Sequence, residues 1–393
     1  MPAFAAMTAD KATGDGENLE PFKNLINAQT VRDAAHHLAR VWQAFPRRRF
    51  ESLALAGLDD LEFKARALHV SAALEACLPN DFSRAADIVE ASLAQVADTQ
   101  ALGELRTSDA GLAGWVIWPM TEFIARRGIA FPERALRALH ALTQRSTAEF
   151  AVRPFIAQHP ALTFATLQGW TTDPNAHVRR LVSEGSRPRL PWGMQLKSLI
   201  RDPTPTWPLL LALQDDPSEY VRRSVANHLN DIAKDHPALV CAWVEQHLPG
   251  ATPQREALLK HASRTLIKHG AARIMKAWGL AQPLRGTATL KLSKRKIALG
   301  GALELRVTLQ SASARNQRLA VDYTVHHVKA NGQTTPKVFK GWTLELAPHA
   351  QRDLRQTHSL RPVTTRTYHA GRHTIELRIN GRNAAAATFD LKV

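Results

Sequence analysis

The chain has very little cysteine, with only Cys77 and Cys241 among 393 residues. Neither stands in a CxxC pair, so the pattern excludes a cysteine zinc site and predicts reduced, buried thiols. No run approaches the roughly eighteen consecutive apolar residues of a membrane-spanning helix. Residues 1–19 lack a basic start followed by an apolar core, so no secretory signal is expected. These absences favour a folded cytoplasmic protein with a flexible leader at 1–19.

Acidic residues are scarce relative to basic ones, and the shortage is uneven. The chain carries 51 Lys and Arg against 35 Asp and Glu, a net charge of +16. Residues 284–393 hold 19 of the basic and 6 of the acidic residues, a net +13, which leaves +3 for the rest. A basic surface of this kind argues for a polyanionic partner and not for a particular fold. Hydrophobic residues make up 45% of the chain, which excludes wholesale disorder.

Apolar residues recur at helical spacing from about residue 20 to residue 280, as in Val31, Ala34, Leu38 and Val41. Prolines and glycines interrupt this pattern after every one or two predicted helices. We therefore expect an all-α region built of about six helical pairs.

One phrase occurs twice, 43 residues apart: DP at 173–174 then VRR at 178–180, and DP at 216–217 then VRR at 221–223. A period near 40 residues is typical of HEAT-type repeats, in which pairs of antiparallel helices stack. Proline at the first helical position loses only an amide that would be unpaired, so each Asp-Pro is expected to start a helix. Arginines repeated at equivalent places favour nucleic-acid backbone as the ligand.

The apolar period changes at Gln282-Pro283 from helical spacing to alternation, which predicts strands. Asn-Gly at 331–332 and at 380–381 predicts tight hairpins. About seven short strands in this region indicate an immunoglobulin-like sandwich. The expected domains are therefore a HEAT-like region, 20–280, and a sandwich, 284–393. The alternating runs are Thr287–Leu292, Leu303–Leu309, Leu319–Val328, Val338–Leu346, His373–Ile379 and Ala384–Val393.

Two segments are unusual for a helical region: STAEFAVRPF at 146–155 and VRRLVSEGSRPRLPW at 178–192. Gly185 and Pro188 predict that a helix ends after Glu184, which would lie at an exposed helix end. A carboxylate there opposes the helix dipole and costs roughly a few tenths of a kcal/mol unless arginines compensate. Local conflict of this kind is expected at functional sites.

Structural explanations compete with function for each candidate residue. Ser146 and Glu149 have the spacing of a capping box. Asp231 is compatible with a solvated helix position, paired with Arg222 or Lys234. For Trp192, sequence alone favours a core position, where most large aromatic side chains lie.

These two segments, with LEFKAR at 61–66 and YVRRSVANHLND at 220–231, resemble the AlkC-type alkylpurine DNA glycosylases, which are HEAT-like repeat enzymes of bacterial DNA repair in the AlkC/AlkD superfamily. The resemblance runs from about residue 21 to residue 279. Some members of that family also carry a C-terminal immunoglobulin-like domain. The resemblance implies excision of 3-methyladenine and 3-methylcytosine from duplex DNA without base flipping. A cationic base departs readily, so anions beside the developing oxocarbenium sugar and a placed water are sufficient.

The resemblance also implies roles for particular residues. Glu149, Glu184 and Asp231 would be the catalytic carboxylates, and Trp192 would be an aromatic wall against the lesion. Arginines would neutralise or bind phosphates. The arginines are Arg153, Arg179, Arg180, Arg187, Arg189, Arg222 and Arg223. Trp118, Glu122 and His228 are candidates for the rim of the site, although packing is favoured for Trp118 and a surface or rim position for Glu122.

No cofactor or metal is expected, because the histidines are scattered. His326 and His327 are adjacent, and adjacent side chains point to opposite faces of a strand.

A non-catalytic HEAT-repeat scaffold for nucleic acid would share the repeats and the basic sandwich. Carboxylates among arginines separate the two hypotheses, because Glu184 and Asp231 would only repel phosphates in a pure backbone binder. The favoured interpretation is therefore a monofunctional glycosylase, acting as a cytoplasmic, nucleoid-associated monomer on double-stranded DNA with alkylated bases, and not at a membrane. The sandwich is expected to contact DNA without supplying a catalytic group; a merely solubilising appendage is the alternative.

Overall fold

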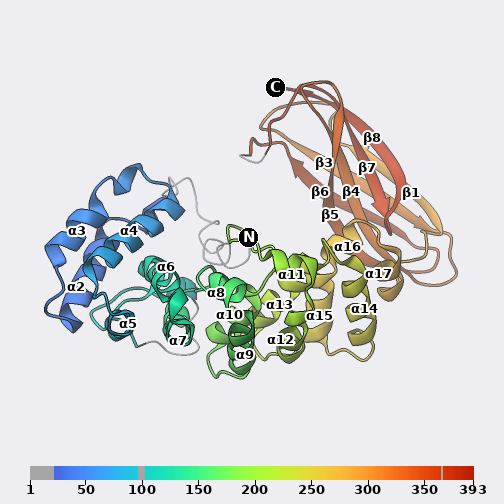
Figure 1. The fold of residues 1–393 in the computed structure, drawn as a ribbon. Helices are drawn as coiled ribbons and strands as arrows, with labels where there is room; N and C mark the ends of the chain where they lie inside the picture. The colour runs from blue at the N-terminus through green and yellow to red at the C-terminus, as the bar shows by residue number, and fades with distance from the viewer. Residues whose placement is uncertain (1–21, 96–101, 364–365) are drawn as a thin grey trace. The chain divides into compact units, whose positions relative to one another are not determined.

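The computed structural model describes residues 22–95, 102–363 and 366–393, so the expected leader at 1–19 lies outside the described residues. Helices come first along the chain and strands follow, as Figure 1 shows. The fold class predicted from the sequence is confirmed: a mainly helical region precedes an all-β region.

The chain divides into two compact units. The first runs to His236 and also takes Thr252–Ala262, and the second comprises Pro237–Ala251 and Ser263–Val393. The second unit therefore contains helices as well as strands. The domain boundary expected between 280 and 284 coincides with the change from helices to strands and not with the division into two units. The last helix ends at Ala277 and the first strand starts at Gly286.

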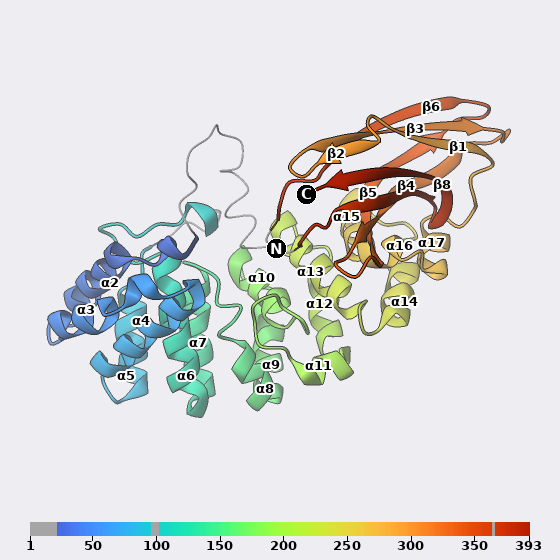
Figure 2. The same cartoon turned by 90° about the horizontal axis from the view of Figure 1, so that it is seen from above.

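The helices of the first unit follow one another in space in the order of the sequence (Figure 2). Helix α4 packs on α6, α10 packs on α13, and α13 packs on α15. They are α2 (Ala28–Val41), α3 (Arg47–Leu55), α4 (Phe63–Cys77), α5 (Phe82–Ala91), α6 (Ile117–Arg127), α7 (Pro132–Thr143), α8 (Arg153–Gln158), α9 (Pro160–Trp170), α10 (Ala176–Gly185), α11 (Lys197–Arg201), α12 (Trp207–Leu213), α13 (Glu219–Ile232) and α15 (Pro253–Ala262). Short 3-10 helices lie at Phe22–Leu25, Leu58–Asp60, Leu102–Glu104, Gly114–Val116, Gly128–Ala130 and Thr204–Thr206.

The two Asp-Pro turns are built alike. Asp173 Oδ1 accepts the amide of Asn175, the N-cap of α10, at 2.8 Å. Asp216 Oδ1 accepts the amide of Ser218, the N-cap of α13, also at 2.8 Å. Each proline thus precedes the N-cap, so the expectation that it occupies the first helical position is wrong. The aspartate side chain, not the proline, organises the turn.

The second unit combines three helices with a two-sheet sandwich. One sheet has the order β1-β3-β6, and the other has the order β2-β8-β7-β4-β5. All pairings are antiparallel except β2 with β8. The elements are α14 (Pro237–His247), α16 (Arg264–Lys268), α17 (Ala272–Ala277), β1 (Gly286–Leu292), β2 (Lys296–Ala298), β3 (Ala302–Ser311), β4 (Gln317–Val328), β5 (Thr334–Leu346), β6 (Gln351–Ser359), β7 (Gly371–Ile379) and β8 (Arg382–Lys392).

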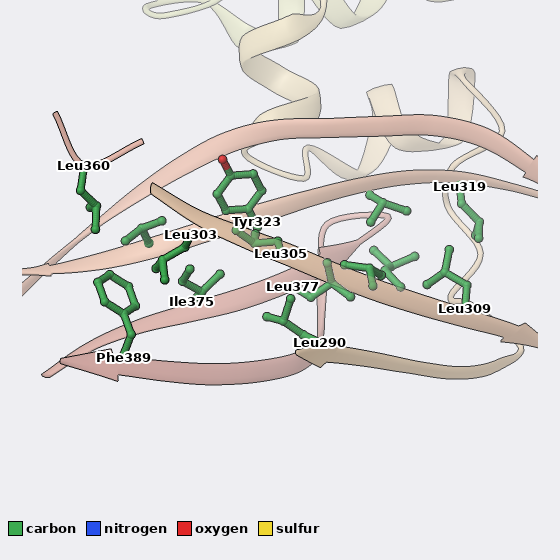
Figure 3. Packing of buried hydrophobic residues seen from close by; sticks show 14 of the residues in the cluster. Leu290, Leu303, Leu305, Leu309, Leu319, Tyr323, Leu360, Ile375, Leu377 and Phe389 are labelled. Carbon is green, nitrogen blue, oxygen red and sulfur yellow. The ribbon is translucent and has the colours of Figure 1, made fainter. Parts of the chain in front are cut away.

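Alternate side chains of both sheets fill the space between them (Figure 3). Leu305 of β3, Tyr323 of β4, Leu377 of β7 and Phe389 of β8 are all at most 2% exposed. Full burial of one such side chain contributes about 1.5–3 kcal/mol. This core holds the sandwich together without a disulfide.

Two strands, β2 and β6, were not located by alternation. In β6 the burial pattern leaves nearly every side chain at least partly exposed, with His358 as the buried exception. At Asn380-Gly381 both residues have positive φ, 48° and 76°, as predicted for a tight hairpin. At 331–332 only Gly332 does, with φ 76°.

Candidate active site

Three carboxylates from separate elements meet in the first unit. Glu149 lies in the turn before α8, Glu184 in the last turn of α10, and Asp231 near the end of α13. Their residues are 3%, 1% and 1% exposed. The expectation that Glu184 sits at an exposed helix end is therefore wrong.

Close packing of α10 against the preceding turn explains this burial. Gly185 is the last residue of α10, and a Cβ there would lie 2.4 Å from Val152 Cγ1. The glycine thus permits contact between two segments and does not form a left-handed cap, since Ser186 is the C-cap. Glu149 is not in a capping box either, because α8 begins four residues later with Val152 as its N-cap.

Acids and arginines alternate through the site. Arg180 Nη1 lies 2.6 Å from Glu149 Oε2, and its Nη2 lies 3.6 Å from Glu184 Oε1. Arg187 Nη1 lies 2.6 Å from Glu184 Oε1, and its Nη2 lies 2.8 Å from Asp231 Oδ2. Each arginine therefore bridges two carboxylates, and we name these five residues the acid–arginine chain. Buried ion pairs need such complete hydrogen bonding to offset desolvation.

Neutral and basic neighbours complete the acid–arginine chain. Ser224 Oγ donates to Glu184 Oε2 at 2.6 Å, and Thr147 Oγ1 donates to Glu149 Oε2 at 2.9 Å. Lys234 Nζ donates to Asp231 Oδ1 at 2.7 Å. The Tyr220 ring lies 5.4 Å from the Arg180 guanidinium carbon, within range of a cation–π contact.

The environment shifts the pKa values of the two glutamates in opposite directions. Burial raises the pKa of Glu149, against the opposing effect of Arg180. Burial acts in the same direction on Glu184, but Arg180 and Arg187 together hold its pKa below the usual value. Carboxyl groups separated in this way are suited to different protonation roles.

His228 belongs to the same interior. It is fully buried, and its Nδ1 lies 2.9 Å from Ser183 O. Burial and the nearby Arg187 lower its pKa to about 3, so the imidazole is neutral. The expected place at the rim of the site is wrong for this residue.

Arg153 organises the loop that follows α10. Its guanidinium donates to the carbonyls of Gly185 and Arg187, both at 2.8 Å, of Pro188 at 3.4 Å and of Met194 at 2.6 Å. The side chain is 0% exposed, and burial together with Arg187 lowers its pKa to about 10. Arg153 therefore shapes the 185–194 loop and does not lie where a phosphate could reach it.

Trp192 lies on that loop with an unusual backbone conformation and an exposed side chain. It has φ 67° and is 54% exposed, which excludes the core position that sequence alone favoured. Its carbonyl accepts from Lys64 Nζ at 3.3 Å. A bulky residue with positive φ costs of order 1–3 kcal/mol and is found where surrounding structure enforces it, often at functional sites.

The arginines expected to bind phosphate fall into two groups. Arg180 and Arg187, at 2% and 3% exposed, are counterions of the carboxylates, so direct phosphate contact is wrong for them and for Arg153 in this conformation. The more accessible group comprises Arg179, Arg189, Arg222 and Arg223.

Arg179 and Arg222 make the same contacts in the two copies of the repeated DP…VRR sequence. Arg179 Nη1 donates to Asp173 O and Pro174 O, and Arg222 Nη1 donates to the equivalent carbonyls of the next repeat. Arg179 also holds Asp216 through two bonds of 2.6 and 3.0 Å, which ties one turn to the next. Arg189 is paired with Asp235 at 2.7 Å, and Arg223 with Glu219 at 3.0 Å.

Trp118 and Glu122 of α6 form a local pair. Trp118 Nε1 donates to Glu122 Oε1 at 2.9 Å, and its ring lies 5.0 Å from that of Phe63 and 5.5 Å from that of Phe150. Trp118 is 4% exposed, in agreement with the packing alternative. Glu122 is partly exposed and lines a small cleft with Leu68.

Across residues 22–95, 102–363 and 366–393, no group of three His, Cys, Asp or Glu side chains is placed to hold a metal ion. No helix in this described part is long and apolar enough to span a membrane.

Comparison with known proteins supports one assignment over almost the whole chain. The model of a family described as the C-terminal Ig-like domain of the uncharacterised protein YhaZ matches residues 286–393. YhaZ of Bacillus subtilis strain 168 is 34% identical over 372 residues, 94% of this chain and 99% of its own. The structure of Pseudomonas fluorescens alkylpurine DNA glycosylase AlkC, bound to DNA containing an abasic site analog, has a TM-score of 0.85 at 34% identity, covering 94% of this chain and 99% of that one. The chain belongs to the AlkC family.

Some partners in this AlkC-family site were missed by sequence reasoning. Thr147, Tyr220 and Ser224 carry no motif of their own. Ser224 lies 40 residues after Glu184, whereas the repeat period of 43 makes Asn227 the equivalent of Glu184, so the repeat does not point to Ser224. Lys234 was considered as a partner of Asp231, and the structure confirms that pair.

Proposed function

We propose that the protein is a monofunctional DNA glycosylase that hydrolyses the N-glycosidic bond of cationic N3-methylated bases, 3-methyladenine and 3-methylcytosine, in double-stranded DNA. The observation that carries this proposal is the acid–arginine chain with its three carboxylates, and the exposed Trp192 lies on the loop that follows Glu184. Its occurrence in a chain with 34% identity to an alkylpurine DNA glycosylase, over 94% of its length, supports the same chemistry.

The chemistry needs negative charge near a sugar that becomes cationic as the base departs. Glu149, Glu184 and Asp231 supply that charge, and Glu184, with its lowered pKa, is ionised at neutral pH. A water held by a carboxylate completes hydrolysis. In this proposal Trp192 provides an aromatic face against the lesion nucleotide, and the nucleotide is not turned into a pocket.

Arg180 and Arg187 act as positioning residues in this proposal. Each holds two carboxylates in a fixed geometry, and electrostatic catalysis depends on such preorganised groups. The accessible arginines, Arg179, Arg189, Arg222 and Arg223, are the proposed phosphate contacts. Their present partners are turn carbonyls and single carboxylates, and we propose that the protein binds DNA in the bacterial cytoplasm as a monomer at the nucleoid.

The proposal is tested by incubating the protein with methylated duplex DNA and measuring released bases by chromatography. We expect Glu184→Gln to slow release by about 10²- to 10³-fold, a common loss for one preorganised electrostatic group. Duplex affinity is expected to stay near or above wild type, because an anion has been removed. Glu133→Gln, an exposed change in the first turn of α7, is the matched control and should release bases normally.

A non-catalytic nucleic-acid scaffold is the alternative. It predicts duplex binding without base release by the unaltered protein, and it predicts that Glu184→Gln changes only affinity. Either result with folded protein would refute the glycosylase proposal.

A further inference from the structure

The second unit contains a pocket of about 520 Å³ that the proposed catalytic site does not use. Strands β4, β5, β7 and β8 form one wall, and Lys268 and His269, at the end of α16, form the other. We name this the basic pocket. Residues that matter for its chemistry are Lys268, Thr324, His326, Lys337, Glu376 and Arg378.

Strand register places the wall residues on the outer face of the five-stranded sheet. Tyr323 and Val325 point into the core between the sheets, so Thr324 between them points outward. Thr324 is directly opposite Val338 of β5 and Glu376 of β7, which puts these three side chains in one row.

Positive charge exceeds negative charge in the basic pocket. Lys268, Lys337 and Arg378 line it, against the single carboxylate of Glu376. Burial, followed by repulsion from Arg366 and Lys268, lowers the pKa of Lys337. Like charges gathered in this way favour binding of an anion between them.

Glu376 accepts a hydrogen bond from a neighbouring amide, and its single negative charge does not balance the three positive charges of the lining. Asn383 Nδ2 donates to Glu376 Oε2 at 3.3 Å, and His326 Nε2 lies 3.0 Å from the same oxygen. That histidine contact lacks hydrogen-bond geometry, because His326 Nε2 is also without a hydrogen-bond partner among the described residues.

Thr324 provides a second, independent observation. The residue is 4% exposed, and its Oγ1 has no hydrogen-bond partner among the residues that the structure describes. A buried hydroxyl without a hydrogen-bond partner lowers the free energy of unfolding by about 1–3 kcal/mol, and most buried polar groups in native proteins are hydrogen-bonded. Since Thr324 lines the basic pocket, its hydroxyl is a donor available to a ligand there.

We propose that the basic pocket binds a phosphate group carried on a nucleotide-sized molecule. Lys268 and Lys337 supply charge and Thr324 donates a hydrogen bond. Arg378 is held by bonds to Lys268 O at 3.4 Å and Gly381 O at 2.8 Å, which fixes its positive charge beside the site. The volume of about 520 Å³ is well above that of a free phosphate ion, so the group belongs to a larger body.

Two sources share this chemistry: a free nucleotide and the backbone of a nucleic acid. The backbone source rests on the proposed function, whereas the free nucleotide does not.

The first test is calorimetric titration of the full-length protein with deoxyadenosine monophosphate and with inorganic phosphate at constant ionic strength. We expect saturable binding at one site, tighter for the nucleotide. Thr324→Val removes the hydroxyl but keeps the side-chain shape, and should weaken binding about 10-fold, as expected for a hydrogen bond to a charged group. Lys268→Gln, an exposed change, should weaken it similarly even if the threonine variant folds poorly.

Lys291→Gln on β1, in the other sheet, is the matched control, because it removes the same charge elsewhere in the sandwich. It should leave nucleotide affinity unchanged. Absence of saturable binding, or equal weakening by Lys291→Gln and Lys268→Gln, would overturn the proposal.

Titration with an unmodified duplex distinguishes the sources. If Thr324→Val weakens duplex binding as it weakens nucleotide binding, the site takes backbone phosphate; if only nucleotide binding weakens, it takes a free nucleotide. Base release is measured separately. A protein that binds nucleotide in the basic pocket but releases no base would refute the proposed function and leave this inference standing.

Discussion

Arg179 and Arg180 are neighbours in the sequence but serve opposite purposes. Arg179 fastens the Asp-Pro turn of its own repeat and the aspartate of the next. Arg180 points inward and bridges two glutamates. In the next repeat Arg222 keeps the turn role, whereas Arg223 is paired with the exposed Glu219. The first arginine of the phrase therefore binds the carbonyls of its turn in both repeats, and the second pairs with buried glutamates in only one.

Substitutions at Arg153 and Trp192 distinguish an effect on the stability of the fold from an effect on base release. Replacing Arg153 with Met removes the donor to four carbonyls, and unsatisfied buried groups cost about 1–3 kcal/mol each. We expect Arg153→Met to lower the free energy of unfolding by about 3 kcal/mol or more, and to reduce base release through the displaced loop. Chemical denaturation and the base-release assay measure the two effects.

Trp192→Ala is the matched variant. Because the ring is half exposed, we expect its free energy of unfolding to change by no more than about 0.5 kcal/mol, as for other surface substitutions. Base release should nevertheless fall. A variant as active as wild type would remove Trp192 from the proposed mechanism.

The position of α10 against the turn before α8 depends on a close approach at Gly185. A Cβ there would meet Val152 Cγ1 at 2.4 Å, far inside ordinary contact distance. We expect Gly185→Ala to destabilise the protein by about 1–3 kcal/mol, the usual cost of overpacking, and to disturb Glu149 and Glu184 together. Thermal and chemical unfolding would measure the loss.

Gly169, near the end of α9, is the control for that substitution. A Cβ there would meet nothing within 4 Å. Gly169→Ala should therefore stabilise the protein by about 0.5–1 kcal/mol through helix propensity alone. If both alanine variants were stabilising, the close contact at Gly185 would not be what holds α10 in place.

Periodicity was sufficient to predict the elements whose faces differ strongly. Helical spacing around Leu38 and alternation around Leu305 reflect one buried face, and both predictions are confirmed. Strand β6 escaped prediction because it lies at a sheet edge with mostly exposed, polar side chains. Its sequence contains little of the alternation that burial imposes.

Motif spacing identified three acids that the structure brings together, but it did not predict their environment. Glu184 was expected to be exposed because glycine and proline follow it. Its burial depends on Val152 and on Ser224, 32 residues before and 40 residues after it, which local pattern does not reveal. Likewise Arg153 looked like a phosphate ligand because its four carbonyl partners come from a loop more than 30 residues away.

At the scale of the whole molecule, buried histidines make stability depend on pH. Burial lowers the pKa of His327 to about 3 and of His358 to about 4, and it also lowers that of His373. In the unfolded chain histidine titrates near pH 6.5. Between about pH 6.5 and these lower values the unfolded state binds more protons, so stability falls as the pH falls. Above about pH 6.5 these groups leave stability constant.

We expect the free energy of unfolding of the sandwich to decrease by about 1.4 kcal/mol per pH unit for each such histidine below pH 6.5. The first unit should respond less steeply, because burial lowers the pKa of two of its histidines, His37 and His228, against three in the sandwich. Hydrogen exchange from pH 7.5 to pH 4.5 would resolve the two units. His358→Gln should flatten the dependence of the sandwich, and an unchanged slope would show that the buried histidines do not cause it.

The concentration of charge in residues 284–393 predicts how the sandwich takes part in DNA binding. This region carries a net +13, and Lys294, Arg295 and Lys296, which run from the β1–β2 turn into the start of β2, are all exposed. If the sandwich touches the duplex there, replacing all three with Gln should weaken binding and reduce the log–log salt slope by about one unit for each phosphate that the protein no longer neutralises. Lys294→Arg with Lys296→Arg keeps the charge and should bind normally. Fluorescence anisotropy across a salt titration measures both, and base release at saturating DNA should be unchanged, because no proposed catalytic group lies in the sandwich. An unaltered salt slope in the triple variant would instead favour a cluster that serves solubility.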